Sequence, residues 1–459
     1  MTHYFTEAAY LAASILFILG LKSLTRTDSA RRGMQQAAVG MLLAIVGTLL
    51  HHEIVRYDWI IGGLVVGTVI GIPLGVMVPM TAMPQRIAIS HMFGALAATL
   101  VGIVEYHEAK GVIAPARMGA IGFEVLFGAL TVTGSFMAFG KLQELVSGKP
   151  ITYPGQNAVN IALFLATLGL LVYIVMHPAT APVFYVMIGL AFVIGISMVL
   201  PIGGADMPVV ISLLNSYAGL AASATGFAIG NNVLIIAGAL DGASGLLLSV
   251  LMSKAMNRSF ANILFGAFGG AAAASAARST EGLAVRSISA DDAALQLAYA
   301  KLVIVVPGYG LAVAQAQHQV RELAGLIEKH GGEVKYAIHP VAGRMPGHMN
   351  VLLAEADVPY DRLYDMDEIN DEFERADVAL VIGANDVVNP AARNDKSSPI
   401  YGMPILNADK AHSIIVLKRS MNPGFAGIEN ELFYDAKTSM LFGDAKASLT
   451  RLVTEVKNV

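Results

Sequence analysis

Two glycines that follow a short apolar run are the first residues whose types and spacing point to chemistry. Leu302–Val306 is typical of a buried strand, and it leads into Gly308-Tyr309-Gly310 and a stretch rich in Ala and Gln. Such a corner lets the backbone turn tightly beside a pyrophosphate, and the following helix directs its N–H groups at the negative charge. The third fingerprint position is Val313 rather than glycine. A strand–turn–helix corner without a ligand therefore stays an alternative.

The residues after two other strands favour NADP(H) over NAD. In an NAD site an acidic residue at the end of the second strand bonds the ribose 2′-OH. The second predicted strand ends in Ala337–Pro340, which contains no carboxylate. A 2′-phosphate requires cations instead, and Lys418-Arg419 directly follows the predicted strand Ile414–Leu417. The alternative for this cation pair is a solvated strand end.

Two more loops follow predicted strands and are rich in polar residues and glycine. In His339–Asn350, Arg344 could hold a phosphate, and in Gly383–Pro390 the side chains of Asn385 and Asp386 come just past a strand. Each loop alone could serve only as a turn. Because the carboxyl ends of parallel strands share one edge of a sheet, the loops together predict a binding site there.

Polar groups also lie inside apolar runs, where they are costly and usually functional. They are His91, Glu124, Ser135, Asn215, Asn231, Asn232 and Asp241. Because histidine titrates near neutral pH, His91 is the natural proton relay; the alternative is a histidine satisfied by a neighbouring carbonyl. Asp206, in Gly203–Pro208, is predicted to cap a helix or to contact a soluble domain.

The composition indicates a membrane protein. Of 459 residues, 55% are hydrophobic and only 14% are charged, about half the usual share in a soluble domain. The absence of cysteine excludes disulfides and thiolate chemistry, and a net charge of −4 gives no sign of a nucleic-acid partner. The acidic start of the chain is better interpreted as leading into a first span than as a cleavable signal.

Nine apolar runs of spanning length precede residue 257, each with the roughly 20 residues that a membrane helix needs. They are 6–24, 34–52, 58–80, 86–105, 118–140, 156–176, 182–202, 207–229 and 232–253. Glycines at helical spacing in the third and ninth runs predict close helix packing. Lys and Arg gather on alternate connections, as at Arg31, Arg32 and Lys254, so the positive-inside rule places the N-terminus outside and the C-terminal part in the cytoplasm.

The remainder of the chain is predicted to be a linker followed by an α/β domain. Residues 1–256 would form an all-α transmembrane bundle, 257–290 a linker rich in small residues, and 291–459 a Rossmann-like domain with a parallel sheet. Ser289 is a candidate helix cap. The expected strands are 303–306, 334–338, 378–382 and 414–417, and the expected helices 310–330, 349–356 and 443–456.

At this point the sequence resembles a known family, the beta subunit of the proton-translocating NAD(P) transhydrogenase. The resemblance covers essentially the whole chain, in the family's order. Its motifs are Gly203–Val210, Gly308–Gln315, His339–Glu355, Gly383–Pro390 and Lys418–Gly427.

The resemblance implies a cytoplasmic domain that binds NADP(H). The implied contacts are Gly308, Tyr309, Gly310, Ala312 and Val313 at the pyrophosphate, Arg344 at the phosphates, Gly383, Asn385 and Asp386 in a loop tied to coupling, Lys418 and Arg419 at the 2′-phosphate, and Gly424 in a lid over Met421–Gly427. In the family NADP(H) lies reversed relative to most Rossmann proteins, so the missing carboxylate is not what selects the cofactor.

The resemblance also implies a proton path along His91, Ser135 and Asn231, with the adjacent Asn232 as an alternative to Asn231, and a coupling role for Asp206. The activity would be hydride transfer from NADH to NADP⁺, coupled to inward proton flow across a bacterial inner membrane, with no metal. NAD(H) would be bound by an alpha subunit, in a dimer of alpha–beta units. The alternative from another class is an ion or solute transporter whose dinucleotide domain only senses redox state.

Overall fold

A computed structural model describes residues 2–25, 29–50, 57–79, 82–109, 113–143, 145–147, 150–203, 206–256, 260, 285–343, 347–396, 398, 400–422 and 428–459. The chain divides into two compact units, Met1–Val250 and Leu251–Val459. Most of the predicted linker, 257–259 and 261–284, lies outside the described residues.

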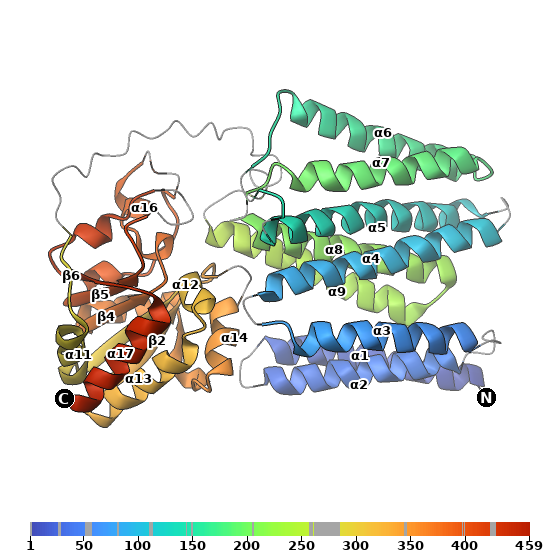
Figure 1. Cartoon of the computed structure of the whole chain (residues 1–459). Helices are drawn as coiled ribbons and strands as arrows, with labels where there is room; N and C mark the ends of the chain where they lie inside the picture. The colour runs from blue at the N-terminus through green and yellow to red at the C-terminus, as the bar shows by residue number, and fades with distance from the viewer. Residues whose placement is uncertain are drawn as a thin grey trace. The chain divides into compact units, whose positions relative to one another are not determined.

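The first unit consists of long helices, and each of the nine apolar runs falls on one of them (Figure 1). They are α1 (Thr2–Leu24), α2 (Ala30–Leu49), α3 (Asp58–Val76), α4 (Met83–Glu108), α5 (Pro115–Leu142), α6 (Gln156–Met176), α7 (Ala181–Val199), α8 (Met207–Ile229) and α9 (Asn232–Ala255). Eight of them are long and apolar enough to cross a membrane. The ninth, α2, begins with two arginines and soon adds two glutamines, which lower its hydropathy.

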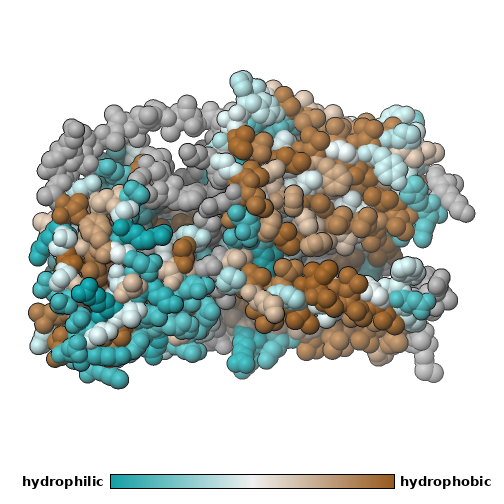
Figure 2. Space-filling view, viewed as in Figure 1, coloured by the Kyte–Doolittle hydropathy of each residue, from teal (hydrophilic) through white to brown (hydrophobic). Residues whose placement is uncertain are grey.

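Apolar side chains cover much of the outer surface of this unit, as Figure 2 shows for one face. Inside, small residues bring the helices together: a Cβ on Gly245 of α9 would lie 2.8 Å from the backbone N of Ser216 on α8. The glycines of α3 differ, because a Cβ on any of them would meet nothing within 4 Å. The predicted close packing is therefore seen for α9 and not, within the described chain, for α3.

The second unit is built on a six-stranded sheet in which every neighbouring pair is parallel. The strand order is β3-β2-β1-β4-β5-β6. The strands are β1 (Leu302–Pro307), β2 (Glu333–Ile338), β3 (Leu363–Asp365), β4 (Val378–Ile382), β5 (Ser413–Lys418) and β6 (Thr438–Phe442). Four of these coincide with the predicted strands. The other two escaped prediction because β3 has only three residues and β6 begins with Thr-Ser.

Each face of the sheet has its own core, because successive strand residues point to opposite faces. Val303 and Val305 of β1 belong to one core and Ile304 and Val306 to the other. Long helices cover the first core: α11 (Ala290–Tyr299), α13 (Gln317–Lys329), α14 (His348–Glu355) and α17 (Ala445–Asn458). Short helices and turns cover the second: α15 (Met366–Ile369), η4 (Asn370–Arg375), η5 (Asp386–Val388), η6 (Ala408–Lys410) and η7 (Glu431–Tyr434). The short α16 (Ala391–Asn394) completes the unit.

The start of this unit differs in one respect from expectation. Ser289 caps α11 as predicted, since its Oγ accepts a hydrogen bond from the Asp292 N–H at 3.1 Å. The preceding residues, expected to be linker, pair with β6: Met440 N–H donates to Arg286 O at 2.7 Å, and Ile288 N–H donates to Met440 O at 3.0 Å. Residues 286–288 thus cover part of an edge strand.

Candidate functional site

The order of the strands changes direction between β1 and β4. The chain runs outward from β1 through β2 to β3, returns to β4, and continues outward through β5 to β6. Because all pairs are parallel, the segments that begin at Gly308, His339, Gly383 and Arg419 follow strands at the same edge of the sheet. Ligands of open α/β sheets bind at the carboxyl edge, where the order reverses. The loops predicted to form a site therefore share that edge.

The glycine turns after β1 and β4 cross each other at this point. Gly308 N–H donates to Ile382 O at 2.8 Å, and Gly310 N–H donates to Gly383 O at 3.0 Å. A Cβ on Gly310 would lie 2.6 Å from the Cα of Gly383, which itself has a φ of +66°. Glycine is thus required where two backbones meet, a reason for these residues that is separate from the approach of a pyrophosphate.

The helix after the glycines is shorter than predicted. Instead of one helix over 310–330, α12 (Tyr309–Val313) ends after five residues, and α13 begins at Gln317. Between them Gln315 has a φ of +49°, a left-handed conformation that ends the first helix. Ala312 is buried, whereas Val313 is 47% exposed. A five-residue helix carries little of the dipole that the fingerprint reasoning assumed.

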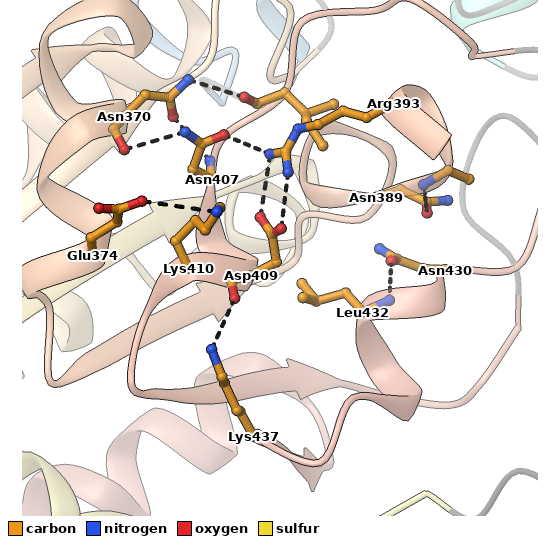
Figure 3. Close-up of polar contacts among 12 residues, drawn as sticks. Asn370, Glu374, Asn389, Arg393, Asn407, Asp409, Lys410, Asn430, Leu432 and Lys437 are labelled. Atoms are coloured by element: carbon orange, nitrogen blue, oxygen red, sulfur yellow. Dashed lines mark hydrogen bonds and ion pairs between the residues drawn. The ribbon is translucent and has the colours of Figure 1, made fainter. Parts of the chain in front are cut away.

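Two buried asparagines, both labelled in Figure 3, hold the loop after β4. Asn430 donates its amide to Asn385 O at 2.9 Å and to Asn385 Oδ1 at 3.3 Å, and its own Oδ1 accepts from the Leu432 N–H at 3.0 Å. Asn389 donates to Glu429 O at 3.0 Å and accepts from the Ala391 N–H. The segment Asn385–Asn389 is thereby fixed to residues 429–432.

Lys418, the last residue of β5, lies within electrostatic reach of Asp386 in that loop. Burial lowers the pKa of the Lys418 ammonium from its ordinary value, and the negative charge of Asp386 offsets part of the shift. The Lys418 Nζ donates to Asn422 O at 2.6 Å and lies 4.6 Å from the centroid of the Phe433 ring. Arg419, the next residue, is exposed. The structure therefore brings one predicted cation together with one predicted acid and leaves a second cation open to solvent.

The loop after β2 contributes a fixed histidine. His339 is buried, its Nδ1 accepts from the Val341 N–H at 3.2 Å, and its Nε2 donates to Pro404 O at 2.8 Å. Burial lowers the pKa of this imidazole, and the bond to Pro404 acts in the opposite direction. Two predicted contacts, Arg344 in this loop and Gly424 in the lid, lie outside the described residues.

In the helical unit, His91 and Ser135 lie at the same level of two neighbouring helices. Position 102 of α4 approaches position 124 of α5, and position 99 approaches position 128. The numbers fall on one helix as they rise on the other, so the helices are antiparallel, and the same pairing continued along them brings position 91 to about position 135. His91 Nδ1 and Ser135 Oγ are both buried and have no hydrogen-bond partner within the described chain. Buried polar atoms without partners are rare and indicate a site for water or another ligand.

The remaining predicted path residues lie elsewhere. Asn231 precedes α9, where its Oδ1 accepts from the Leu234 N–H at 3.1 Å and its amide donates to the Tyr10 OH at 3.4 Å; Asn232 is exposed. Leu214, which packs at the level of Gly134, is 17 residues earlier, roughly 25 Å along a helix. Asn231 is therefore not gathered with His91 and Ser135. Asp206 occupies the N-cap position of α8, but its side chain makes no capping hydrogen bond.

Comparison with known proteins supports one family along the whole chain. The family model described as the NAD(P) transhydrogenase beta subunit matches residues 6–455. The chain belongs to this family. Two curated relatives are named NAD(P) transhydrogenase subunit beta, and both come from Rhodospirillum rubrum, one of them from a named strain. Each is 50% identical to this chain over 461 residues, which is 99% of this chain and 99% of the relative. The chain is accordingly an integral membrane protein of the transhydrogenase beta family, with membrane-spanning helices and a parallel-sheet domain.

Within this transhydrogenase beta chain, several polar residues that position the sites were not singled out from the sequence. Asn389 and Asn430 resemble ordinary turn residues, and no local pattern reveals that they bind each other's loops.

In the membrane, Thr225 of α8 donates to Glu124 of α5 at 2.6 Å, while the second oxygen of the fully buried Glu124 carboxyl has no partner in the described parts of the chain. The spacing of a polar residue on each helix could have signalled this pair only if the helix register had been known.

Proposed function

We propose that this chain binds NADP(H) in its C-terminal unit, residues 291–459, and carries protons through its helical unit, residues 1–256. It would act as a subunit of an enzyme that transfers hydride from NADH to NADP⁺, coupled to inward proton translocation. The observation that carries the proposal is the position of Lys418 at the edge where the glycine turns cross. There it lies within electrostatic reach of Asp386 and is followed by the exposed Arg419. Family membership supports the same activity.

These residues fit a phosphorylated dinucleotide. Lys418 and Arg419 would hold the 2′-phosphate, since a dianionic phosphate is bound best by charge-assisted hydrogen bonds. Arg344 would hold the remaining phosphates, and Gly308–Val313 would lie against the pyrophosphate. Gly383 and Asn385 would form the opposite wall, with Gly424 in a covering segment. When NADP(H) is bound, its nicotinamide supplies the hydride chemistry; the chain itself needs only to position it and exclude water.

Proton transfer would involve His91 of α4 and Ser135 of α5, which lie at the same level of these two helices. Each has a buried polar atom without a hydrogen-bond partner in the described chain. Asn231 or Asn232 would contribute at the α8–α9 turn. Protonation near His91 would alter how the C-terminal unit holds NADP(H) through a two-state element, with Asp206 and Asp386 in the coupling. Equal NADP(H) affinity and turnover in the parent chain and in His91→Asn would exclude that role.

The assembly would contain an alpha subunit that binds NAD(H), in a dimer of alpha–beta units. The membrane would be a bacterial inner membrane, with the N-terminus outside and the C-terminal unit in the cytoplasm. The Lys/Arg bias of the connections supports this orientation.

The decisive experiment uses residues 285–459, which contain both cores of the sheet and the pairing at 286–288. NADPH and NADH are titrated separately while nucleotide fluorescence is followed. We expect strong preference for NADPH, lost in Lys418→Ala/Arg419→Ala. The matched control, Arg451→Ala/Lys457→Ala, removes the same charge from α17, which leads away from the carboxyl edge. Equal or absent binding in the parent segment would refute the proposal and favour a redox-sensing transporter.

A further inference from the structure

A small pocket lies beside strand β2, on the face of the sheet that α13 covers. Its volume is about 70 Å³, well above the roughly 10–15 Å³ that a single water needs. Four polar residues line it: Arg321, Glu328, Tyr336 and Arg362. In the strand order, β2 lies three strands from β5, roughly 14 Å from the strand that ends in Lys418. The pocket is therefore separate from the edge proposed for NADP(H).

Two walls with a defined backbone hold the charged groups of the pocket. On α13, positions 321, 324 and 328 follow one another at spacings of three and four residues and share one face of the helix. The small Ala324 leaves open space between Arg321 and Glu328. The opposite wall is the segment 358–362, whose first N–H donates to Leu353 O at 3.0 Å. The charged side chains thus extend from elements that the fold already fixes.

A buried hydroxyl forms the inner part of the pocket. Tyr336 is 2% exposed, and its OH has no hydrogen-bond partner among the described residues. Burial raises the pKa of this phenol, so it keeps its proton at neutral pH and can donate. Arg321, Glu328 and Arg362 all lie within electrostatic reach of the hydroxyl. Buried polar atoms without partners are rare and indicate a place for water or another ligand.

The two guanidinium groups of the pocket have donors to spare. Arg321 forms no ion pair with a described residue. Arg362 Nη2 lies 3.6 Å from Glu328 Oε1, and its Nη1 lies 3.8 Å from Glu333 Oε1; both distances are too long for hydrogen bonds. Each guanidinium offers five N–H donors in a planar fork that matches the oxygens of an anion. The pocket is therefore rich in donors and short of acceptors.

We propose that this pocket binds a small tetrahedral oxyanion of the phosphate class, which accepts hydrogen bonds from Arg321, Arg362 and the Tyr336 hydroxyl. These donors come from three separate elements, α13, the segment 358–362 and β2, and an ion with four oxygens can accept from each of them. A carboxylate has only two oxygens. The Glu328 carboxylate repels the ion and competes with it for Arg362. When bound, the ion would connect α13 to the segment before β3.

The test follows the ³¹P relaxation of inorganic phosphate titrated with the full chain in a phosphate-free detergent at constant ionic strength. The background is Lys418→Ala/Arg419→Ala, so that the proposed nucleotide site does not contribute. We expect saturable binding that Arg321→Ala and Arg362→Ala each weaken about ten-fold or more, as for a lost hydrogen bond to a charged group. The matched control Arg375→Ala removes the same charge from η4, which covers the other face of the sheet, and should bind like the background. No saturable binding, or an equal loss in the control, would overturn the proposal.

Two further variants should change binding in opposite directions. Glu328→Gln removes the competing carboxylate and should tighten phosphate binding several-fold. Tyr336→Phe keeps the ring and should weaken binding about two- to twelve-fold, the range of one neutral hydrogen bond. Without phosphate its melting temperature should be unchanged or higher, because the substitution removes an unpaired buried hydroxyl. No tightening in Glu328→Gln, or unchanged binding in Tyr336→Phe, would contradict the inference.

Two other anions identify what the pocket accepts. Methyl phosphate that binds as well as inorganic phosphate would assign the pocket to the end of a phosphate monoester. Weaker binding of methyl phosphate would assign it to the free ion, and either result supports the proposal. Acetate that binds as tightly as phosphate would overturn the assignment to a tetrahedral oxyanion.

Discussion

Replacing Asn430 by alanine should weaken NADPH binding by more than its effect on stability explains. Asn430 is 2% exposed and connects two parts of the sheet domain that are 45 residues apart in sequence. Its amide holds Asn385, a proposed cofactor contact, and its Oδ1 caps η7 through the Leu432 N–H. The substitution Asn430→Ala removes all of these bonds and leaves the loop after β4 without its principal restraint.

The expected size follows from the bonds that are lost. Three neutral hydrogen bonds at about 1 kcal/mol each predict a loss of about 3 kcal/mol in the free energy of unfolding. For a domain of this size, that lowers the melting temperature by roughly 6–12 °C. In addition, NADPH must now order at least one freed residue of the Asn385 loop, at roughly 1–2 kcal/mol. This corresponds to about a five- to thirty-fold loss of affinity.

The assay combines thermal unfolding and NADPH titration on residues 285–459, with Asn370→Ala as the matched control. Asn370 makes two side-chain bonds, one fewer than Asn430: it donates to Ile405 O at 3.1 Å and accepts from the Asn407 N–H at 2.9 Å, in the cluster around Arg393 (Figure 3). Both variants should lose stability, but only Asn430→Ala should lose affinity in this range. Equal affinity losses in the two variants would refute the positioning role of Asn430.

Two further predictions concern the same edge of the sheet. Gly383→Ala combines a φ of +66° with a Cβ only 2.5 Å from the Leu311 backbone N, so we expect it to cost well over the roughly 1–2 kcal/mol of left-handed strain alone. The control Gly331→Ala has a φ of +91° but open space around it, and a similar loss in both variants by thermal unfolding would be inconsistent with the crossing of the turns. Burial lowers the pKa of His339 in the folded state, so the unfolded state binds more protons. The stability that neutral His339 contributes is therefore complete above about pH 6.5, the ordinary pKa of histidine, and is lost as the pH falls below that value. Denaturant unfolding from pH 7.5 to 5 should show this decline, smaller in His339→Gln and unchanged in the exposed His330→Gln; an unaltered decline in His339→Gln would contradict the assignment.

Local patterns were sufficient to predict the frame of this protein. Apolar runs about 20 residues long located the nine long helices that the structure describes in the first unit, and β-branched runs located β1, β2, β4 and β5. These signals are local, because a spanning helix or a buried strand is defined by the consecutive residues within it. The break at Gln315 was missed since the Ala-rich and Gln-rich sequence around it favours helix, and only the left-handed φ ends α12.

Contacts between distant segments could not be predicted in this way. The bond between Thr225 and Glu124 joins residues 101 positions apart, and that between Asn430 and Asn385 joins residues 45 positions apart. Each depends on the register of two elements, which hydrophobic periodicity leaves undetermined. The sequence therefore indicated which loops share an edge of the sheet, but not which side chains hold those loops in place.

Asp241 shows how such a contact changes the meaning of a residue. From the sequence alone, it was one of seven polar groups inside apolar runs, among which His91 was the predicted proton relay. The structure separates these groups by where their side chains lie. His91 Nδ1, Ser135 Oγ and one Glu124 oxygen are buried without partners inside the bundle, whereas Asp241 is exposed on its outside. Lipid penalises both arrangements. Buried polar atoms without partners indicate room for water, so His91 and Ser135 favour the proposed proton route inside the bundle.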